Sequence, residues 1–181
     1  VILAVLAEPI FRLLYTEKWL PAVPYFQILC ATGILYPIHA YNLQILNVKG
    51  RSDLFLKLEV IKKILFLIIL IIAFQFGIYG LLYGSVVFSL LAFGINTHYS
   101  GKFINYTIWH QTKDLLPSIV LALIAGFGIY GLDVYLTQLN FNDFSRIALG
   151  GLLGMITFLL LAWLFKLNAL FELKTILLKR K

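Results

Sequence analysis

Two pairs of polar side chains interrupt apolar stretches of this sequence at helical spacing. Glu8 and Arg12 are four residues apart and His39 and Asn42 three apart, so each pair would share one face of an α-helix. In lipid such groups are costly, and they either line a polar passage or bond to a neighbouring helix. For His39 and Asn42 the alternatives are a hydrophilic cavity that passes a polar headgroup and an interhelical hydrogen bond. For Glu8 and Arg12 they are a gate or substrate contact at a cavity mouth and a local ion pair.

Motifs of catalysis and of cofactor binding are absent from the sequence. It contains no GxxxxGK[ST], HExxH, GxSxG or CxxC pattern, and its single cysteine, Cys30, lies in an apolar segment. The acidic residues of the predicted outer loops, Glu17, Asp133 and Asp143, are scattered and have no partner histidine. We therefore expect no enzyme, no catalytic residue, no cofactor and no metal site.

The composition is that of a membrane protein. Hydrophobic residues make up 61% of the 181 residues and charged residues 13%, and the mean hydropathy is +0.94. An average soluble domain is roughly 45–50% apolar and about 25% charged. The net charge of +7 does not indicate a nucleic-acid partner, because the basic residues fall at the ends of apolar runs without interleaved aromatic residues. We expect membrane lipids as the partner of most of the surface.

Six apolar runs predict membrane-crossing helices, the first of them truncated. About 20 apolar residues cross a bilayer as a helix. The runs are residues 1–15, 22–46, 58–75, 79–100, 115–132 and 147–165. We expect Gly77 and Gly80 to break the third from the fourth and form a hairpin, and Asn96 to need only a solvent-facing position near a helix end. The predicted fold class is all-α, a polytopic transmembrane helical bundle.

The distribution of Lys and Arg between the predicted loops sets the expected orientation. Lys18 and Arg146 lie on one side, and Arg12 lies inside the first segment. Twelve of the fifteen basic residues lie on the other side, which the positive-inside rule makes cytoplasmic together with the C-terminus. These twelve are Lys49, Arg51, Lys57, Lys62, Lys63, Lys102, Lys113, Lys166, Lys174, Lys179, Arg180 and Lys181.

Five of these basic residues gather within residues 46–63 and predict a cytoplasmic anchor. Residues 50–53, Gly-Arg-Ser-Asp, indicate a turn with Ser52 as the N-cap of a helix lying partly in the interface. The lysines of that helix can extend to anionic headgroups. The predicted anchor residues are Lys49, Arg51, Lys57, Lys62 and Lys63, and residues 166–181 repeat the arrangement.

Residues 6–63 resemble a stretch of bacterial polysaccharide transporters, specifically the O-antigen or lipopolysaccharide flippase branch of the multidrug, oligosaccharidyl-lipid and polysaccharide exporter superfamily. Beyond residue 63 only hydropathy and charge alternation agree. The resemblance rests on Glu8-Pro9, Lys18-Trp19, Ala22, Pro24, Gln27-Ile28-Leu29, Tyr36-Pro37, Asn42, Asn47, Gly50-Arg51-Ser52-Asp53 and Leu56-Lys57-Leu58-Glu59.

The resemblance implies the C-terminal part of a two-lobe transporter in the bacterial cytoplasmic (inner) membrane. The sequence starts at Val1, inside an apolar run, which agrees with that expectation. Residues 1–101 would be later helices of the second lobe, and residues 102–181 two extra C-terminal helices with a basic interfacial tail. The whole protein would flip an undecaprenyl-linked oligosaccharide by alternating access, with a polysaccharide polymerase or glycosyltransferases as further partners. The charged cavity of such proteins lies largely on early helices of each lobe, so no substrate-binding residue is carried over.

Two other functions remain open at this point. The chain could be a membrane scaffold of polysaccharide assembly that transports nothing and recruits a glycosyltransferase. It could also be a drug or ion antiporter of the same superfamily, in which case an acidic ion-coupling cluster is expected upstream.

Overall fold

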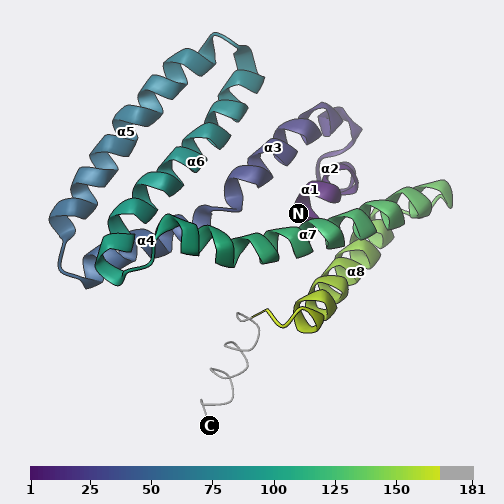
Figure 1. Ribbon diagram of the computed structural model, residues 1–181. Coiled ribbons are helices and arrows are strands. Elements are labelled where there is room, and N and C mark those ends of the chain that lie inside the picture. Colours follow the sequence, from purple (N-terminus) through teal and green to yellow (C-terminus); the bar gives the residue numbers. More distant parts are fainter. Residues whose placement is uncertain (168–181) are drawn as a thin grey trace. The chain divides into compact units, whose positions relative to one another are not determined.

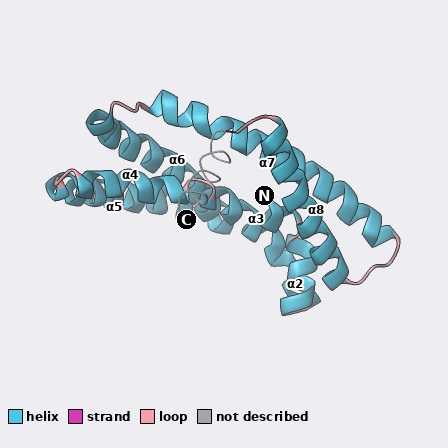
Figure 2. Ribbon diagram, turned by 90° about the horizontal axis from the view of Figure 1, so that it is seen from below, coloured by secondary structure: helices cyan, strands magenta, loops and turns pink. Residues whose placement is uncertain are grey.

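The computed structural model describes residues 1–167, and these fold almost entirely into helices (Figure 1). No strand occurs in this part of the chain (Figure 2). The predicted all-α helical class is therefore confirmed. The predicted basic tail falls outside the described residues except for its first two positions.

The chain divides into two compact units. Unit 1 combines residues 1–23 with the chain from Lys113 onward, and unit 2 is residues 24–112. These units are defined by internal packing, whereas the predicted division after residue 101 concerns descent from a transporter lobe and stays a prediction.

Unit 2 is built around a helical hairpin. Helices α5 (Ser52–Phe74) and α6 (Gly77–Ile104) run side by side in opposite directions (Figure 1). Gly77 adopts a φ of +65° at the turn, a conformation that costs glycine little because it has no Cβ. The predicted hairpin and its turn are confirmed. Gly80 is not a breaker, because it lies inside α6 against the Ala73 carbonyl group of α5.

The predicted helix over residues 22–46 is interrupted. Its residues divide between α3 (Val23–Gly33) and α4 (Tyr36–Val48), and the 3-10 helix η1 (Glu17–Ala22) precedes α3 directly. The break at Ile34 and Leu35 comes just before Pro37, the second residue of α4, which lacks the N–H that would bond to the Gly33 carbonyl and whose ring would clash with that carbonyl. The kink expected from Pro37 is therefore a full interruption of the helix two residues upstream.

The turn between α4 and α5 forms where the sequence predicts it. Gly50 has a φ of +68°, and α5 begins at Ser52. The expected N-cap was wrong by one residue, because Arg51 occupies the cap position and no side chain there accepts a hydrogen bond from the first turn. Ser52 is instead the first residue of the helix.

Unit 1 contains α1 (Ile2–Val5), α2 (Ala7–Tyr15), η1, most of α7 (Ile108–Gln138) and α8 (Asp143–Leu164). Leu6 and Ile129 are fully buried here and pack on the glycines of α8. A Cβ at Gly150 would meet Leu6 at 2.9 Å, and one at Gly154 would overlap Ile129. A residue larger than glycine would not fit at either position, because side chains of the neighbouring helices fill the space where its Cβ would lie.

Four helical stretches in the described part of the chain are long and apolar enough to cross a membrane. They are Glu17–Val48, Gly77–Ile104, Ile108–Gln138 and Asp143–Leu164. Many of their large apolar side chains are exposed, as expected for surfaces that face lipid. The protein is a multi-pass membrane protein.

Helix α5 forms as predicted but is not among these four stretches. Five charged residues occupy its first half: Asp53, Lys57, Glu59, Lys62 and Lys63. Its uncharged part, residues 64–74, would extend about 16 Å as a helix, roughly half the thickness of the hydrocarbon core. The truncated first segment likewise forms only the short helices α1 and α2. Helix α5 carries too many charges, and the first segment is too short, for either to count among the membrane-crossing stretches. Two of the six predicted crossings are therefore not found.

Candidate functional site: a polar groove in unit 2

A groove of about 590 Å³ opens between the helices of unit 2. Helices α4, α5 and α6 form most of its wall, and Thr32 at the end of α3 completes it. Its volume falls in the range of about 300–1,000 Å³ that is usual for ligand sites. The polar side chains in its wall are Thr32, Tyr36, His39, Glu59, Lys62, Lys63, Ser85, Ser89 and Asn96.

Four of these residues form a chain of hydrogen bonds in which each residue donates to the next. Ser89 donates its hydroxyl to the Thr32 carbonyl oxygen at 3.4 Å, so its oxygen is available to accept from His39 Nε2 at 3.3 Å. With the proton on Nε2, His39 Nδ1 accepts from the Asn96 amide nitrogen at 3.4 Å. The chain of donors therefore begins at Asn96 and ends at the backbone of α3.

The other half of the Asn96 amide has no hydrogen-bond partner among the described residues. Asn96 is 1% exposed, and its Oδ1 is buried without a hydrogen bond. Oδ1 is the unpaired atom when the His39 proton is on Nε2, and the other tautomer of His39 would exchange the roles of the two amide atoms. The expectation that Asn96 faces solvent at a helix end was wrong. Hydropathy alone does not reveal that α4 packs over this part of α6.

Two lysines of α5 give the groove a positive charge. Lys62 is 8% exposed and forms an ion pair with Glu59, one turn earlier on the same helix. Lys63 is exposed beside it in the groove wall. Because Glu59 neutralises one lysine, a single positive charge remains. The ammonium group of Lys62 turns to Glu59, and its predicted extension to lipid headgroups stays a prediction.

Asn42 lies outside the groove, in a buried cluster that joins three helices. Its amide and that of Gln111 donate to each other, at 2.9 and 3.1 Å. Ser100 donates to Asn42 Oδ1 at 2.6 Å, and Thr97 lies 3.3 Å from Asn42 Nδ2. All four side chains are buried. For Asn42 the structure contains the interhelical bond, whereas His39 both bonds to α6 and lines the groove.

Glu8 and Arg12 form the predicted local ion pair in unit 1, at 2.9 Å. Arg12 also binds Glu17 at 3.1 Å, which the sequence analysis did not anticipate. Thr16 between them adopts a positive φ of 72°, and the sharp turn there returns Glu17 to Arg12.

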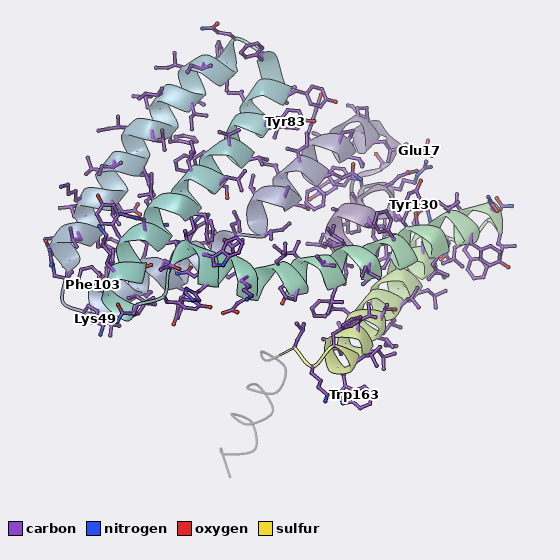
Figure 3. All side chains as sticks on the ribbon, viewed as in Figure 1. Glu17, Lys49, Tyr83, Phe103, Tyr130 and Trp163 are labelled. Carbon is purple, nitrogen blue, oxygen red and sulfur yellow. The ribbon has the colours of Figure 1, made fainter. Side chains whose placement is uncertain are left out.

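The other predicted anchor residues, Lys49, Arg51 and Lys57, are exposed. Arg51 donates to both carboxylate oxygens of Asp53 at 3.0 Å, which lowers the pKa of Asp53 from its ordinary value. Its guanidinium group also lies 5.6 Å from the centre of the Phe103 ring. Figure 3 shows Lys49 and Phe103 at the same end of unit 2. These residues form a charged, solvent-accessible end of the unit.

A buried ion cluster in unit 1 was missed by the sequence analysis. Arg146, 5% exposed, donates from Nε and Nη2 to the two carboxylate oxygens of Asp133, both at 2.9 Å. It also donates to Asp143 at 2.9 Å. Two of the three acidic residues described as scattered, Asp133 and Asp143, thus converge on one arginine. The available signal was that Asp133, Asp143 and Arg146 all lie in the loop predicted between the helices of residues 115–132 and 147–165.

Among the residues that the structure describes, no group of three or more His, Cys, Asp and Glu side chains could hold a metal ion. Comparisons of the chain with protein-family models, with curated proteins and with solved structures give no match. The groove and its residues must therefore be interpreted by their own chemistry.

Proposed function

We propose that this chain is part of an integral membrane flippase that exports a lipid-linked oligosaccharide, a precursor of surface polysaccharide, by alternating access. The observation that carries the proposal is the groove of unit 2, where polar and cationic side chains face an open space in otherwise apolar helices. Polar groups at membrane depth are costly and are retained where they contact a substrate.

The charge and shape of the groove suit an anionic lipid. Its net positive charge, from Lys63 beside the Lys62–Glu59 pair, would attract a diphosphate group. The flanking faces of α5 and α6 expose residues such as Ile64, Leu67 and Leu90, along which an acyl or polyprenyl chain could remain in contact with lipid. A headgroup in the groove and a chain in the bilayer is the arrangement that lipid transport requires.

The broken helix beside the groove supports a change of shape during transport. Between α3 and α4 only Ile34 and Leu35 are non-helical, and the adjacent Gly33 has no atom near its missing side chain. A few residues at helix ends can absorb the rotations of domain closure. Rotation there would move His39 and Tyr36 relative to α6 and so open or narrow the groove.

The resemblance of residues 6–63 to polysaccharide transporters supports the same function and suggests the bacterial cytoplasmic membrane. The excess of Lys and Arg in alternate loops favours a cytoplasmic C-terminus. A polysaccharide polymerase and glycosyltransferases are the partners that such a function would require.

A transport assay with the native protein that carries these residues tests the proposal. The protein is placed in proteoliposomes with a fluorescent undecaprenyl-diphosphate oligosaccharide, and the rate at which the lipid becomes accessible to an external quencher is measured. Lys63→Gln should slow transport about tenfold or more, because a hydrogen bond to a charged group is worth about 1.5–3 kcal/mol.

Lys57→Gln is the matched control, since Lys57 lies on the same helix but not in the groove wall. It should transport at the wild-type rate. A wild-type protein that moves no lipid would contradict the proposal and favour a scaffold role. Equal loss in the two variants would mean that the groove is not the route.

A further inference from the structure

Helix α7 belongs to both compact units of the chain. Its residues up to Thr112 lie in unit 2 and those from Lys113 onward in unit 1, although the helix is continuous across this boundary. Buried side chains attach each part of the helix to its own unit. The short segment between the two attachments therefore decides whether α7 is a rigid rod or can bend.

The first turn of α7 is attached to unit 2 through Gln111. This residue is 5% exposed, and its amide and the Asn42 amide of α4 donate to each other at 2.9 and 3.1 Å. Asn42 also accepts a hydrogen bond from Ser100 of α6 at 2.6 Å. Because separating these groups would leave buried polar atoms unpaired, the first turn of α7 moves together with α4 and α6.

The second half of α7 is attached to unit 1 by an apolar stripe. Leu121, Ala125 and Ile129 recur every fourth residue, and each is at most 4% exposed. The Ile129 side chain also fills the space that a Cβ at Gly154 of α8 would need. This half of the helix therefore moves together with α8.

Between these attachments the helix is weakly held. None of residues 112–120 is buried. Pro117 lies in the middle of this segment and has no N–H, so the Lys113 carbonyl lacks its helical hydrogen bond and is crowded by the proline ring. Few buried contacts mark segments of low local stability, and sharp bends in helices occur mainly at proline.

The other connection between the units also contains a proline. The chain passes from unit 1 to unit 2 between Val23 and Pro24, where η1 gives way to α3. Pro24, like Pro117, cannot donate to a carbonyl of the preceding turn. Weakened helical turns thus occur at or close to both places where the chain changes unit.

We propose that residues 113–117 form a hinge at which the first turn and the second half of α7 bend relative to each other. A hinge is a few residues that absorb changes of φ and ψ while the attached parts stay rigid. Gln111 is bonded to Asn42, and His39 lies one turn earlier on α4 in the groove wall, so bending couples the groove wall to the rest of α7. The motion does not depend on what the groove binds.

A distance measurement across the hinge tests this proposal. Nitroxide labels are placed on Trp109→Cys and Phe127→Cys of the native protein in nanodiscs, in a cysteine-free background that includes Cys30→Ser. Both positions are exposed and lie 18 residues apart, on one face of α7. A straight helix would separate them by about 27 Å. Pulsed electron spin resonance should find a broad distribution of distances that extends below this value.

The control pair is Val120→Cys with Gln138→Cys, which has the same spacing but lies entirely after Pro117. Its distribution should be narrower and unchanged by Pro117→Ala. The same substitution restores the missing N–H and should narrow the Trp109–Phe127 distribution to a centre at about 27 Å. A Trp109–Phe127 distribution as narrow as the control, or one that Pro117→Ala leaves unchanged, would overturn the hinge.

A second measurement uses the wild-type protein alone. Amide hydrogens of residues 116–120 should exchange about 2- to 12-fold faster than those of residues 127–131, after correction for intrinsic rates, because one hydrogen bond contributes a factor of this size. Equal protection of the two segments would show that α7 is uniformly rigid and would contradict the hinge.

Discussion

The ion cluster of unit 1 allows a prediction whose size follows from its geometry. Asp133→Leu removes both carboxylate oxygens that Arg146 contacts at 2.9 Å and leaves Arg146 with Asp143 alone. Breaking a buried ion pair from one side typically costs about 3–5 kcal/mol, because the remaining charge is uncompensated. Since Asp143 still offsets part of that charge, we expect the lower end, about 3 kcal/mol of unfolding free energy.

The assay is equilibrium unfolding in mixed micelles, followed by circular dichroism. The variants are Asp133→Leu, Arg146→Met and the double variant, with Asp53→Asn in an exposed pair as the control. The double variant should be more stable than the sum of the single losses predicts, because it leaves neither partner of the broken pair as a buried charge. A loss below about 1 kcal/mol for Asp133→Leu, or additive losses in the double variant, would refute a buried, coupled pair.

Two further predictions concern unit 2. Gly80→Ala should destabilise the protein by about 1–2 kcal/mol despite a gain of about 1 kcal/mol in helix propensity, because the new Cβ would overlap the backbone carbonyl of Ala73. Gly94→Ala, where nothing lies within 4 Å, should instead be neutral or stabilising by up to about 1 kcal/mol in the same mixed-micelle unfolding assay; the reverse order would refute the assigned packing. The pKa of Asp53 is lowered chiefly by its hydrogen bonds from Arg51, so the stability from this pair should be present above the ordinary carboxyl pKa and lost as the pH falls through the lowered one. An NMR titration should find that Arg51→Gln returns the pKa of Asp53 toward its ordinary value, and an unchanged pKa would contradict the pairing.

Local signals in the sequence predicted the helices and their turns well. The hairpin turn at Gly77 and the turn at Gly50 need a positive φ, which glycine supplies, and both turns form as expected. The Glu8–Arg12 pair was also predictable, because it depends only on helical spacing.

Features that depend on packing between helices were not predictable in the same way. Asn96 and Lys62 lie in sequence contexts that look exposed, and only the placement of α4 and α5 against α6 buries them. Hydropathy reports how apolar a helix is, but in a helix that is apolar all round it does not report which face meets a neighbour. The convergence of Asp133 and Asp143 on Arg146 depends likewise on the fold of the α7–α8 turn.

The most direct test of the proposed function is to measure which leaflet holds the lipid-linked oligosaccharide after the native protein is depleted from cells. The lipid can be labelled from outside with a membrane-impermeant reagent and its total amount measured after lysis. The flippase account predicts a normal or increased total of which the externally accessible share collapses, because the precursor is made but stays on the cytoplasmic face. A normal accessible share, or a total that falls in proportion with it, would contradict transport and indicate a role in assembly of the precursor instead.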